Sequence, residues 1–289
     1  MSTNWALALH GGAGAIAEHA YQREEAHMAE LAERGAAMLA RGQSALDVVV
    51  AMAEALEACG LHLAGKGAAP NSAGKVELDA SVMDGTNRAA GAVAALSGFV
   101  SPVQVARGVM ERTTHVLLAG DGAAAFAAEQ GYAAVDDPAS YYTPAASGLT
   151  AAETKHGTIG AVACDAQGRL AAATSTGGLT GKMPGRVGDT PIIGAGCWAD
   201  QRAAVSCTGL GEYFMRVNAA ADVSARIAYA GQSLKDAADA VLADVKQLGG
   251  DGGLIAVDSK GHVAAPFVSQ GMKRGIVTSA GFREIKTFR

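Results

Sequence analysis

Two apolar runs surround a turn in the stretch Thr158-Ile-Gly-Ala-Val-Ala-Cys-Asp-Ala-Gln-Gly-Arg-Leu-Ala-Ala-Ala-Thr174. The turn has Asp165 at its first position and Gly168 at its fourth, which is typical of a type I turn in a β-hairpin. The same arrangement returns between Leu254 and Pro266, around Asp258-Ser-Lys-Gly261. We therefore expect two antiparallel hairpins of one design in the second half of the chain.

Each half of the chain also carries a predicted pair of helices. In the first half, apolar residues recur at helical spacing between Met28 and Gly42, and a second helix opens at Ser44, which forms a capping pattern with Asp47. In the second half, helices are predicted at 212–230 and 234–248. Strands and helix pairs in both halves pack most simply as two mostly antiparallel sheets between helix layers. We predict an α+β fold of this kind, formed by a single domain over residues 1–289.

The composition is that of a compact protein that acts on small molecules. Hydrophobic residues make up 49% of the 289 residues, charged residues make up 18%, and the formal net charge is −5. No basic stripe is present that could neutralise a phosphate backbone, so we expect no nucleic-acid partner. The start of the chain lacks the pattern of a signal peptide, and no apolar stretch reaches the roughly 18 residues of a membrane span. We expect a cytoplasmic protein that does not bind membranes.

The segment 132–157 differs in composition from the rest of the chain. It contains paired aspartates, Pro138 and Pro144, together with Ser and Ala, and it shows neither helical nor strand periodicity. We predict a mobile linker over these residues.

One motif near the start of the chain is typical of proteins that bind a nicotinamide dinucleotide. Gly12-Ala-Gly-Ala-Ile-Ala17 matches the G-x-G-x-x-[GA] fingerprint of dinucleotide-binding sites. That fingerprint also requires a second strand and an acidic residue about 20 positions further on. Here those positions fall inside the helical stripe that begins at Met28, so we expect a structural turn and no nicotinamide cofactor.

Several other catalytic or metal-binding motifs are absent from the sequence. It contains no G-x-S-x-G and no H-E-x-x-H, and its seven histidines never fall four residues apart, so a metal site built from two histidines of one helix face is not expected. The cysteines form no C-x-x-C pair, and we expect reduced thiols in the core. They are Cys59, Cys164, Cys197 and Cys207.

Thr158 lies at the centre of the region richest in Thr, Gly, Arg and Asp, residues 155–211. A threonine hydroxyl is a poor nucleophile alone, but a free α-amine on the same residue can act as its base near neutral pH. Such an amine requires cleavage of the chain after Gly157. A glycine at this position tolerates strained backbone conformations, and the preceding linker lets a new chain end move away. The local sequence therefore permits self-cleavage.

Motifs along nearly the whole chain carry a specific resemblance. They are Leu9-His-Gly-Gly-Ala-Gly14, Leu78-Asp-Ala-Ser-Val-Met-Asp-Gly85, Gly157-Thr-Ile-Gly-Ala-Val162, Thr174-Ser-Thr-Gly-Gly178, Pro184-Gly-Arg-Val-Gly-Asp189, Ser206-Cys-Thr-Gly-Leu-Gly211 and Gly249-Gly-Asp-Gly-Gly253. In this order they resemble the plant-type asparaginase/isoaspartyl peptidase family of N-terminal-nucleophile hydrolases. The resemblance implies a four-layer αββα sandwich and an inactive precursor that cleaves itself before a threonine.

The resemblance assigns the nucleophile and the groups around it. The cleavage site is Gly157–Thr158, and the products are residues 1–157 and 158–289. Thr158 Oγ attacks the side-chain amide of asparagine or the β-peptide bond of an isoaspartyl dipeptide, and an acyl-enzyme is hydrolysed to release aspartate. Thr176 orients and polarises the nucleophile. The Thr208 hydroxyl and the Gly209 N–H form the oxyanion hole.

Two charged residues, Arg186 and Asp189, can bind the two charged groups of an amino acid. Arg186 can bind a carboxylate through two parallel hydrogen bonds, and Asp189, three residues away, can pair with an ammonium group. The resemblance assigns the α-carboxylate to Arg186 and the α-amine to Asp189, with backbone at Gly209 and Gly211 completing the site. Gly157 favours the isoaspartyl peptidase branch, because glycosylasparaginases and threonine aspartases usually have Asp before the nucleophile.

The sequence departs from the family pattern just after the second helix. Family members typically have Asn-Ala-Gly-x-Gly-Ala where this chain has Leu63-Ala-Gly-Lys-Gly-Ala68. The apolar Leu63 is predicted to permit self-cleavage but to alter or weaken hydrolysis. Two alternatives stay open on this ground: a non-catalytic homologue that binds amino-acid-like ligands, and an enzyme that acts on a different β-aminoacyl amide.

The resemblance also implies an ion and an assembly. No cofactor is required, but a structural Na⁺ is expected in the loop that ends at the departure just described. Its ligands are the backbone carbonyls of about Leu56, Glu57, Cys59, Leu61 and Leu63. The expected assembly is a dimer of cleaved units, which is a heterotetramer after cleavage.

Overall fold

Two β-sheets form the centre of the protein in a computed structural model that describes residues 4–145 and 157–289. The larger sheet has eight strands in the order β12-β11-β1-β5-β6-β2-β3-β4, and the smaller has four in the order β10-β9-β8-β7. The larger sheet consists of β1 (Ala6–His10), β2 (Leu78–Asp84), β3 (Ala90–Leu96), β4 (Leu117–Ala119), β5 (Ile159–Cys164), β6 (Leu170–Thr176), β11 (Arg274–Thr278) and β12 (Arg283–Lys286). The smaller consists of β7 (Cys197–Ala199), β8 (Ala203–Gly209), β9 (Gly252–Asp258) and β10 (Val263–Ala264). Of the pairings between these strands, that of β3 with β4 is parallel and the others are antiparallel.

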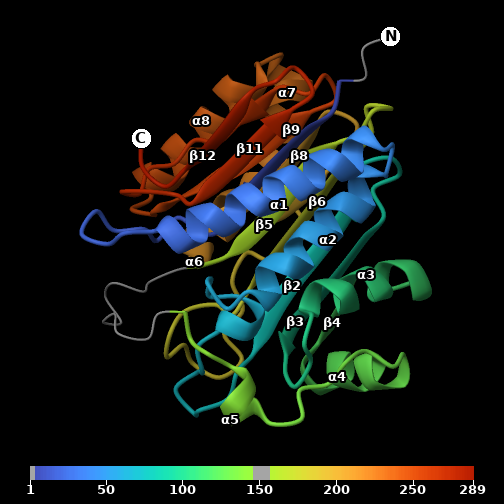
Figure 1. Cartoon of the computed structure of the whole chain (residues 1–289), viewed down its shortest axis with the longest axis vertical. Coiled ribbons are helices and arrows are strands. Elements are labelled where there is room, and N and C mark those ends of the chain that lie inside the picture. Colours follow the sequence, from blue (N-terminus) through green and yellow to red (C-terminus); the bar gives the residue numbers. More distant parts are fainter. Residues whose placement is uncertain (1–3, 146–156) are drawn as a thin grey trace.

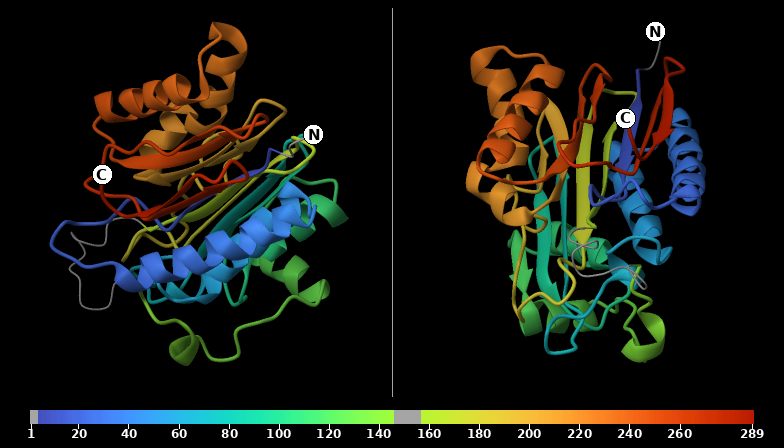
Figure 2. Two further views of the ribbon diagram at one scale, coloured as in Figure 1. Left: turned by 45° about the horizontal axis from the view of Figure 1, so that its top comes forward. Right: turned by 90° about the vertical axis from the view of Figure 1, so that its left-hand side faces the viewer.

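Helices cover the outer face of each sheet. The larger sheet is covered by α1 (Gln22–Ala40), α2 (Ala45–Ala58) and α3 (Pro102–Arg112), and the smaller by α6 (Gly211–Val217), α7 (Ala219–Ala230) and α8 (Leu234–Gln247). The 3₁₀ turn η1 (Gly65–Gly67), α4 (Gly120–Glu129) and α5 (Pro138–Tyr141) complete the described elements. Figure 1 shows α1 and α2 lying across the larger sheet, and the right-hand view of Figure 2 shows the two helix layers on opposite sides of the strands. The α+β fold with two sheets between helix layers is confirmed.

Alternating side chains of the central strands enter two different hydrophobic clusters. In β6, Ala171 and Ala173 pack toward the helices of the larger sheet, whereas Leu170 and Ala172 pack toward the smaller sheet. Both faces of the strand are therefore buried, which explains why its sequence is apolar throughout instead of alternating with polar residues. The small side chains let the layers approach closely.

Local signals in the sequence account for the turns and for one helix start. The Gly168 N–H donates to the Asp165 carbonyl at 2.8 Å, and the Gly261 N–H donates to the Asp258 carbonyl at 3.0 Å. Both glycines have positive φ, near 75° and 81°, as the close of such hairpin turns requires. The Ser44 side chain accepts from the Asp47 N–H at 3.1 Å and caps α2 as predicted.

The prediction of one helix over 212–230 is wrong. The segment forms α6 and α7, which Asn218 separates with a left-handed φ of 51°. Asparagine tolerates this conformation better than most residues, because its short polar side chain can hydrogen-bond locally. The apolar spacing continues across the break, so periodicity alone does not reveal it.

The described part of the predicted linker is attached to the rest of the protein. Within residues 132–145, α5 forms, the Thr143 N–H donates to the Lys66 carbonyl at 2.9 Å, and the Ala145 N–H donates to the Gly67 carbonyl at 3.0 Å. The remainder of the predicted linker, up to residue 156, lies outside the described residues. The described residues up to Ala145 are therefore held beside η1.

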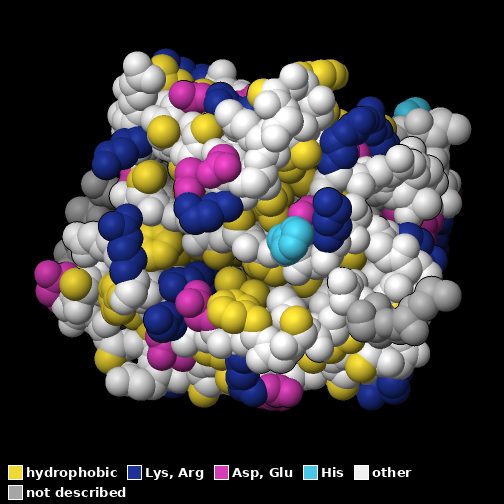
Figure 3. All heavy atoms as spheres, turned by 90° about the horizontal axis from the view of Figure 1, so that it is seen from above, with side chains coloured by type: hydrophobic (Ala, Val, Ile, Leu, Met, Phe, Trp, Pro, Cys, Tyr) yellow, Lys and Arg dark blue, Asp and Glu magenta, His cyan; other side chains and the backbone are white. Residues whose placement is uncertain are grey.

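Charged side chains of both signs are mixed on the surface, as the sequence predicts from its lack of a basic stripe. On the face drawn in Figure 3, basic and acidic side chains are interspersed, with hydrophobic side chains between them. Among the described helices, none has the length and hydropathy that crossing a bilayer demands.

Two glycines offer a matched test of how tightly the layers pack. A Cβ added at Gly35 in α1 would overlap with Leu7 of β1, whereas a Cβ at Gly122 in α4 would meet nothing within 4 Å. We expect Gly35→Ala to reduce the free energy of unfolding by about 1–3 kcal/mol through overpacking. Gly122→Ala should raise it by up to about 1 kcal/mol, because alanine favours the helix. Urea denaturation measures both, and equal midpoints for the two variants would contradict this packing.

Candidate active site

Thr158 directly precedes β5 and lies between the two sheets. It is buried, and β1 and β6 flank the strand that it opens. Its hydroxyl donates to the Thr176 Oγ1, at the end of β6, over 3.3 Å. The Gly178 N–H donates to the same Thr176 oxygen at 3.0 Å. Thr176 is thus held by the backbone and positions the Thr158 hydroxyl in turn.

One pocket brings together most of the residues that the sequence singled out. Its lining consists of Thr158, Thr176, Gly178, Leu179, Arg186, Gly188, Asp189, Thr190 and Gly209. Two further residues of the predicted site do not line it. Thr208 is fully buried beside Gly209, and Gly211 packs against the Asp189 carboxylate, where a Cβ would lie 2.6 Å from Oδ1. The roles assigned to these residues stay predictions.

Asp189 has a buried carboxyl group, one oxygen of which has no hydrogen-bond partner among the described residues. Its side chain is in the pocket, yet its Oδ2 is buried and has no hydrogen-bond partner among the described residues. Burial raises its pKa to about 7, against the opposing effect of hydrogen bonding with its own backbone and of the Arg186 charge. A cationic group that entered the pocket would supply the missing partner and favour the ionised carboxylate.

Arg186 is held in place by an acidic residue of the next helix. Its Nε and Nη2 lie 2.9 and 2.8 Å from Glu212 Oε1, at the start of α6. A Cβ at Gly188 would lie 3.0 Å from the Arg186 Nη1, so the glycine lets the guanidinium lie close to the backbone of the pocket. Glu212 therefore orients the guanidinium through Nε and Nη2. The third nitrogen, Nη1, lies close to Gly188, which lines the pocket.

Thr208 and Gly209 end strand β8, and Gly209 lines the same pocket as Thr158. The Ala13 N–H donates to the Thr208 Oγ1 at 3.2 Å, so the hydroxyl oxygen is an acceptor there and its proton can be donated elsewhere. Gly209 packs so closely on the neighbouring strand that a Cβ would overlap with the Asp251 carbonyl oxygen. Only glycine allows the backbone to line the pocket at this point.

His10, at the end of β1, supports the backbone of Thr158. Its Nδ1 lies 3.1 Å from the Thr158 carbonyl oxygen, and its Nε2 lies 2.9 Å from the Ser206 Oγ, which is 2.8 Å from the Thr174 Oγ1. A carbonyl oxygen can only accept, so Nδ1 must carry the ring proton and Nε2 must accept from Ser206. Burial lowers the pKa of His10 to about 3, so the ring is neutral.

Gly157, which precedes Thr158, is enclosed from two sides. A Cβ at Gly157 would lie 2.6 Å from the Leu63 Cβ, and a Cβ at Gly12 would lie 3.1 Å from the Gly157 Cα. The Leu63 side chain therefore contacts the predicted cleavage site and is not part of the pocket lining. The Leu63 carbonyl accepts from the Gly177 N–H at 2.7 Å, which joins this loop to the end of β6.

The chain can now be compared with known families. A sequence model of the family described as Asparaginase matches residues 3–147 and 140–287. This chain belongs to the asparaginase family. The predicted resemblance is confirmed, and the matched ranges together include every residue of the pocket.

Individual relatives of this asparaginase-family chain are similar over nearly their full length. The isoaspartyl peptidase of Salmonella typhimurium is 50% identical over an alignment that covers 93% of each chain. That of Escherichia coli is 46% identical and covers 93% of this chain and 91% of its own. The human isoaspartyl peptidase/L-asparaginase is 40% identical, with 91% of this chain and 89% of its own covered.

Sequence reasoning missed three residues that organise this asparaginase-family site. His10 stands inside a quoted motif without a predicted role. Ser206 likewise begins a quoted motif without a predicted role, and Glu212 directly follows one. Motif membership was the available signal for His10 and Ser206, whereas the contact of Glu212 with Arg186 depends on the path of the chain into α6.

The His10 network yields a stability prediction. His10→Ala leaves the Thr158 carbonyl and the Ser206 hydroxyl without their partner in a buried site, which we expect to cost about 1–3 kcal/mol of unfolding free energy. The variant should be compared in the Thr158→Ala background, so that all molecules stay uncleaved. His262→Ala is the control, because that side chain is 70% exposed, and it should change stability by less than about 0.5 kcal/mol. A His10 variant as stable as the control would refute the network.

Proposed function

We propose that this chain is a self-cleaving threonine hydrolase of β-aspartyl amide bonds, acting on isoaspartyl dipeptides and on L-asparagine. The observation that carries the proposal is a single pocket in which the Thr158 hydroxyl lies with Arg186 and Asp189. The pocket thus combines a nucleophile with groups complementary to both charges of an amino acid. The names of the similar proteins, isoaspartyl peptidase and isoaspartyl peptidase/L-asparaginase, support the same reaction.

The first step of the proposed mechanism is cleavage of the chain itself. Thr158 Oγ attacks the Gly157 carbonyl carbon, and the peptide nitrogen leaves as the α-amine of Thr158, taking up the hydroxyl proton. Water hydrolyses the resulting ester and leaves a carboxylate on Gly157. The new amine has an ordinary pKa of about 7.7–8.0, so a large share of it is a neutral base at physiological pH.

In the second step, the same hydroxyl attacks the substrate. Thr158 Oγ attacks the β-carbonyl carbon while its α-amine takes the proton and passes it to the leaving nitrogen, which departs as ammonia or as the amine of an amino acid. The Thr208 hydroxyl and the Gly209 N–H donate to the oxyanion, a type of interaction whose loss costs about 3–4 kcal/mol. Water then attacks the ester, which releases aspartate and restores the hydroxyl.

Leu63 does not favour a non-catalytic protein. Its side chain packs on Gly157, outside the pocket lining, so it takes no position there that a substrate-binding polar group would need. We therefore assign its influence to the placement of the cleavage site and retain a catalytic function.

We also propose the Na⁺ site, the assembly and the compartment that the resemblance implies. The loop after α2 curls back so tightly that a Cβ at Gly65 would lie 2.6 Å from the Glu57 carbonyl oxygen, and curled backbone of this kind gathers carbonyl donors. Leu56 and Leu63 already accept hydrogen bonds through their carbonyls, so they can bind the ion only through their second lone pairs.

Dimerisation of cleaved units is proposed from the resemblance alone. The four cysteines are free thiols, which supports a cytoplasmic location.

Self-cleavage has a direct test in the mass of the denatured protein. We expect freshly purified wild-type protein to yield two fragments divided between Gly157 and Thr158, and Thr158→Ala to remain a single 28.9 kDa chain. Only the cleaved protein should hydrolyse isoaspartyl dipeptides and L-asparagine. A wild-type protein that hydrolyses these substrates as an intact chain would disprove the amine-base mechanism.

The raised pKa of Asp189 predicts how ligand binding depends on pH. Only the ionised carboxylate pairs with an ammonium group, and with a pKa of about 7 its ionised fraction falls about tenfold between pH 8 and pH 6. This change alone would raise the inhibition constant of L-aspartate about tenfold. Protonation of the Thr158 amine attracts the aspartate carboxylate and acts with the opposite sign, but with an ordinary pKa of about 7.7–8.0 its protonated fraction rises only about two- to threefold between pH 8 and pH 6. We therefore expect a net rise of about three- to fivefold.

Asp189→Asn is the matched control for this pH dependence. Its inhibition constant should be higher than that of the wild type and should lose the increase toward pH 6. A wild-type inhibition constant that stays level or falls toward pH 6 would show that Asp189 does not bind the amine.

A further inference from the structure

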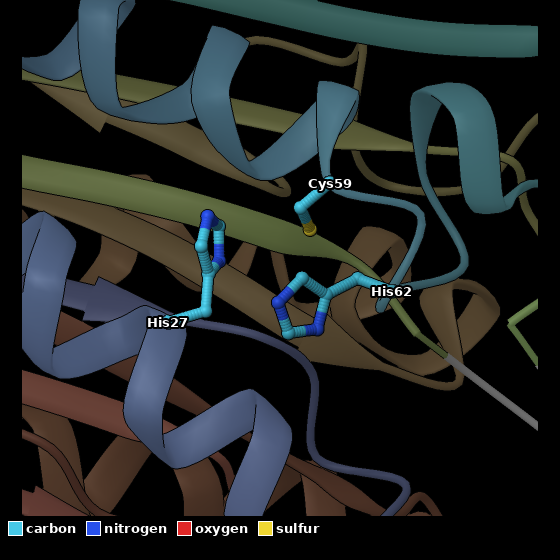
Figure 4. A group of neighbouring side chains, drawn as sticks. All are labelled: His27, Cys59 and His62. Atoms are coloured by element: carbon cyan, nitrogen blue, oxygen red, sulfur yellow. The ribbon is translucent and has the colours of Figure 1, made fainter.

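Three side chains from separate segments converge outside the threonine pocket. His27 comes from α1, Cys59 follows the end of α2, and His62 lies in the loop beyond it. One donor atom from each lies within 4.8 Å of the other two. Figure 4 shows the thiol and the two imidazole rings gathered in the space between the helices.

The imidazole nitrogens in this cluster are buried without partners. Both nitrogens of His62 and the Nδ1 of His27 are shielded from solvent and have no hydrogen bond of ordinary geometry within residues 4–145 and 157–289. The His62 side chain is only 1% exposed. Leaving a buried polar group unpaired is unfavourable, and only one nitrogen of each ring can face a shared ligand. One nitrogen of His27 and one of His62 therefore call for a specific partner beside the Cys59 thiol.

The backbone around the cluster holds its donors in place. Gly11 lies against the His62 ring so closely that a Cβ there would overlap with Cε1, which fixes the position of the imidazole. The Leu61 N–H lies 3.4 Å from the Cys59 Sγ and can donate to a thiolate. The thiol itself donates to the Leu56 carbonyl at 3.2 Å, and this proton is the one that a metal ion would displace to solvent.

We propose that His27, Cys59 and His62 bind one zinc ion, with water as the fourth ligand. Imidazole nitrogen and thiolate sulfur are the donors that zinc prefers, at about 2.0–2.1 and 2.3 Å. Tetrahedral geometry then separates the donor atoms by about 3.5 Å, so the cluster has to contract by roughly 1 Å at its widest. The half-exposed His27 on the surface of α1 can supply this movement.

The electrostatic surroundings favour this site only in part. Burial lowers the pKa of His27 and of His62, and both rings are therefore neutral and able to ligate. The Lys273 charge opposes a cation at this place, while the Glu24 carboxylate on α1 favours it. A monovalent Cu⁺ would carry one charge less with the same soft ligands, which makes it the competing metal in any test.

The proposed site is distinct from the Na⁺ site and lies next to the nucleophile. Na⁺ is a hard cation and was assigned to backbone carbonyls, whereas zinc takes the Cys59 sulfur and two imidazoles. His62 directly precedes Leu63, and Gly11 directly precedes Gly12, and both of these second residues contact Gly157. Zinc would thus fix the loop that carries Leu63, against which Gly11 packs through the His62 ring.

The test is a titration of tag-free, chelator-treated full-length protein with Zn²⁺, followed by calorimetry. It is run on the wild type and on Thr158→Ala, so that the result does not depend on self-cleavage or hydrolysis. We expect one ion per chain and a higher melting temperature in both proteins. Co²⁺ in place of Zn²⁺ should give a thiolate-to-metal charge-transfer band in the near ultraviolet.

Variants assign the ligands. Cys59→Ser and His27→Gln should each weaken zinc binding at least tenfold, and Cys59→Ser should abolish the charge-transfer band. Cys164→Ser and His115→Gln are the matched controls, and both should bind as the wild type does. Absence of saturable binding, or equal binding by Cys59→Ser, would overturn the proposal. Tight binding of Cu⁺ under anaerobic conditions without binding of Zn²⁺ would overturn the assignment to zinc.

Discussion

Strand β5 is hydrogen-bonded along both of its edges, to β1 and to β6, and the placement of Thr158, the proposed nucleophile, depends on these two ladders. Thr158 directly precedes the strand, so its position is fixed by pairing that begins at the next residues. The larger sheet also mixes strands from both sides of Gly157, with β1 to β4 before it and β5, β6, β11 and β12 after it. A cut at Gly157 therefore passes through no described strand, and the shared sheet holds the two segments together.

A glycine in β5 also allows the two sheets to approach closely. Gly160 faces the smaller sheet, and a Cβ there would overlap with the Ser206 Oγ. The space that this glycine leaves is filled by His10, which bonds to Ser206 and to the Thr158 carbonyl. A polar network inside an apolar layer is stable only when its members are all paired, and this one is. Glycine and small side chains thus make room for the groups that fix the backbone of the nucleophile.

The sequence was sufficient for the features that depend on local chemistry. The Asp165–Gly168 turn, the Ser44 cap and the two-layered sheet arrangement follow from residue type and spacing, and the motifs placed five site residues in one pocket. What escaped prediction depends on tertiary contacts. The left-handed Asn218 interrupts a continuous apolar pattern, and His27 and His62 lie 35 positions apart, so that only the packing of α1 against the loop after α2 brings them together. Spacing rules for histidines on one helix cannot find such a site.

Burial alone does not distinguish a functional polar group from a structural one, but its partners do. Glu57 is buried, and burial raises its pKa to about 8, yet its carboxyl oxygens have hydrogen-bond partners in the Ser101 hydroxyl, the Ser175 hydroxyl and the Val103 N–H. With these partners it joins α2 to α3 and β6 and needs no ligand. Asp189 is as deeply buried, but its Oδ2 has no partner within the described residues, and the residue lines a pocket together with Thr158. An unpaired carboxyl oxygen is unfavourable in a buried site, and this missing partner, which Glu57 does not lack, is the reason for proposing that Asp189 binds an ammonium group.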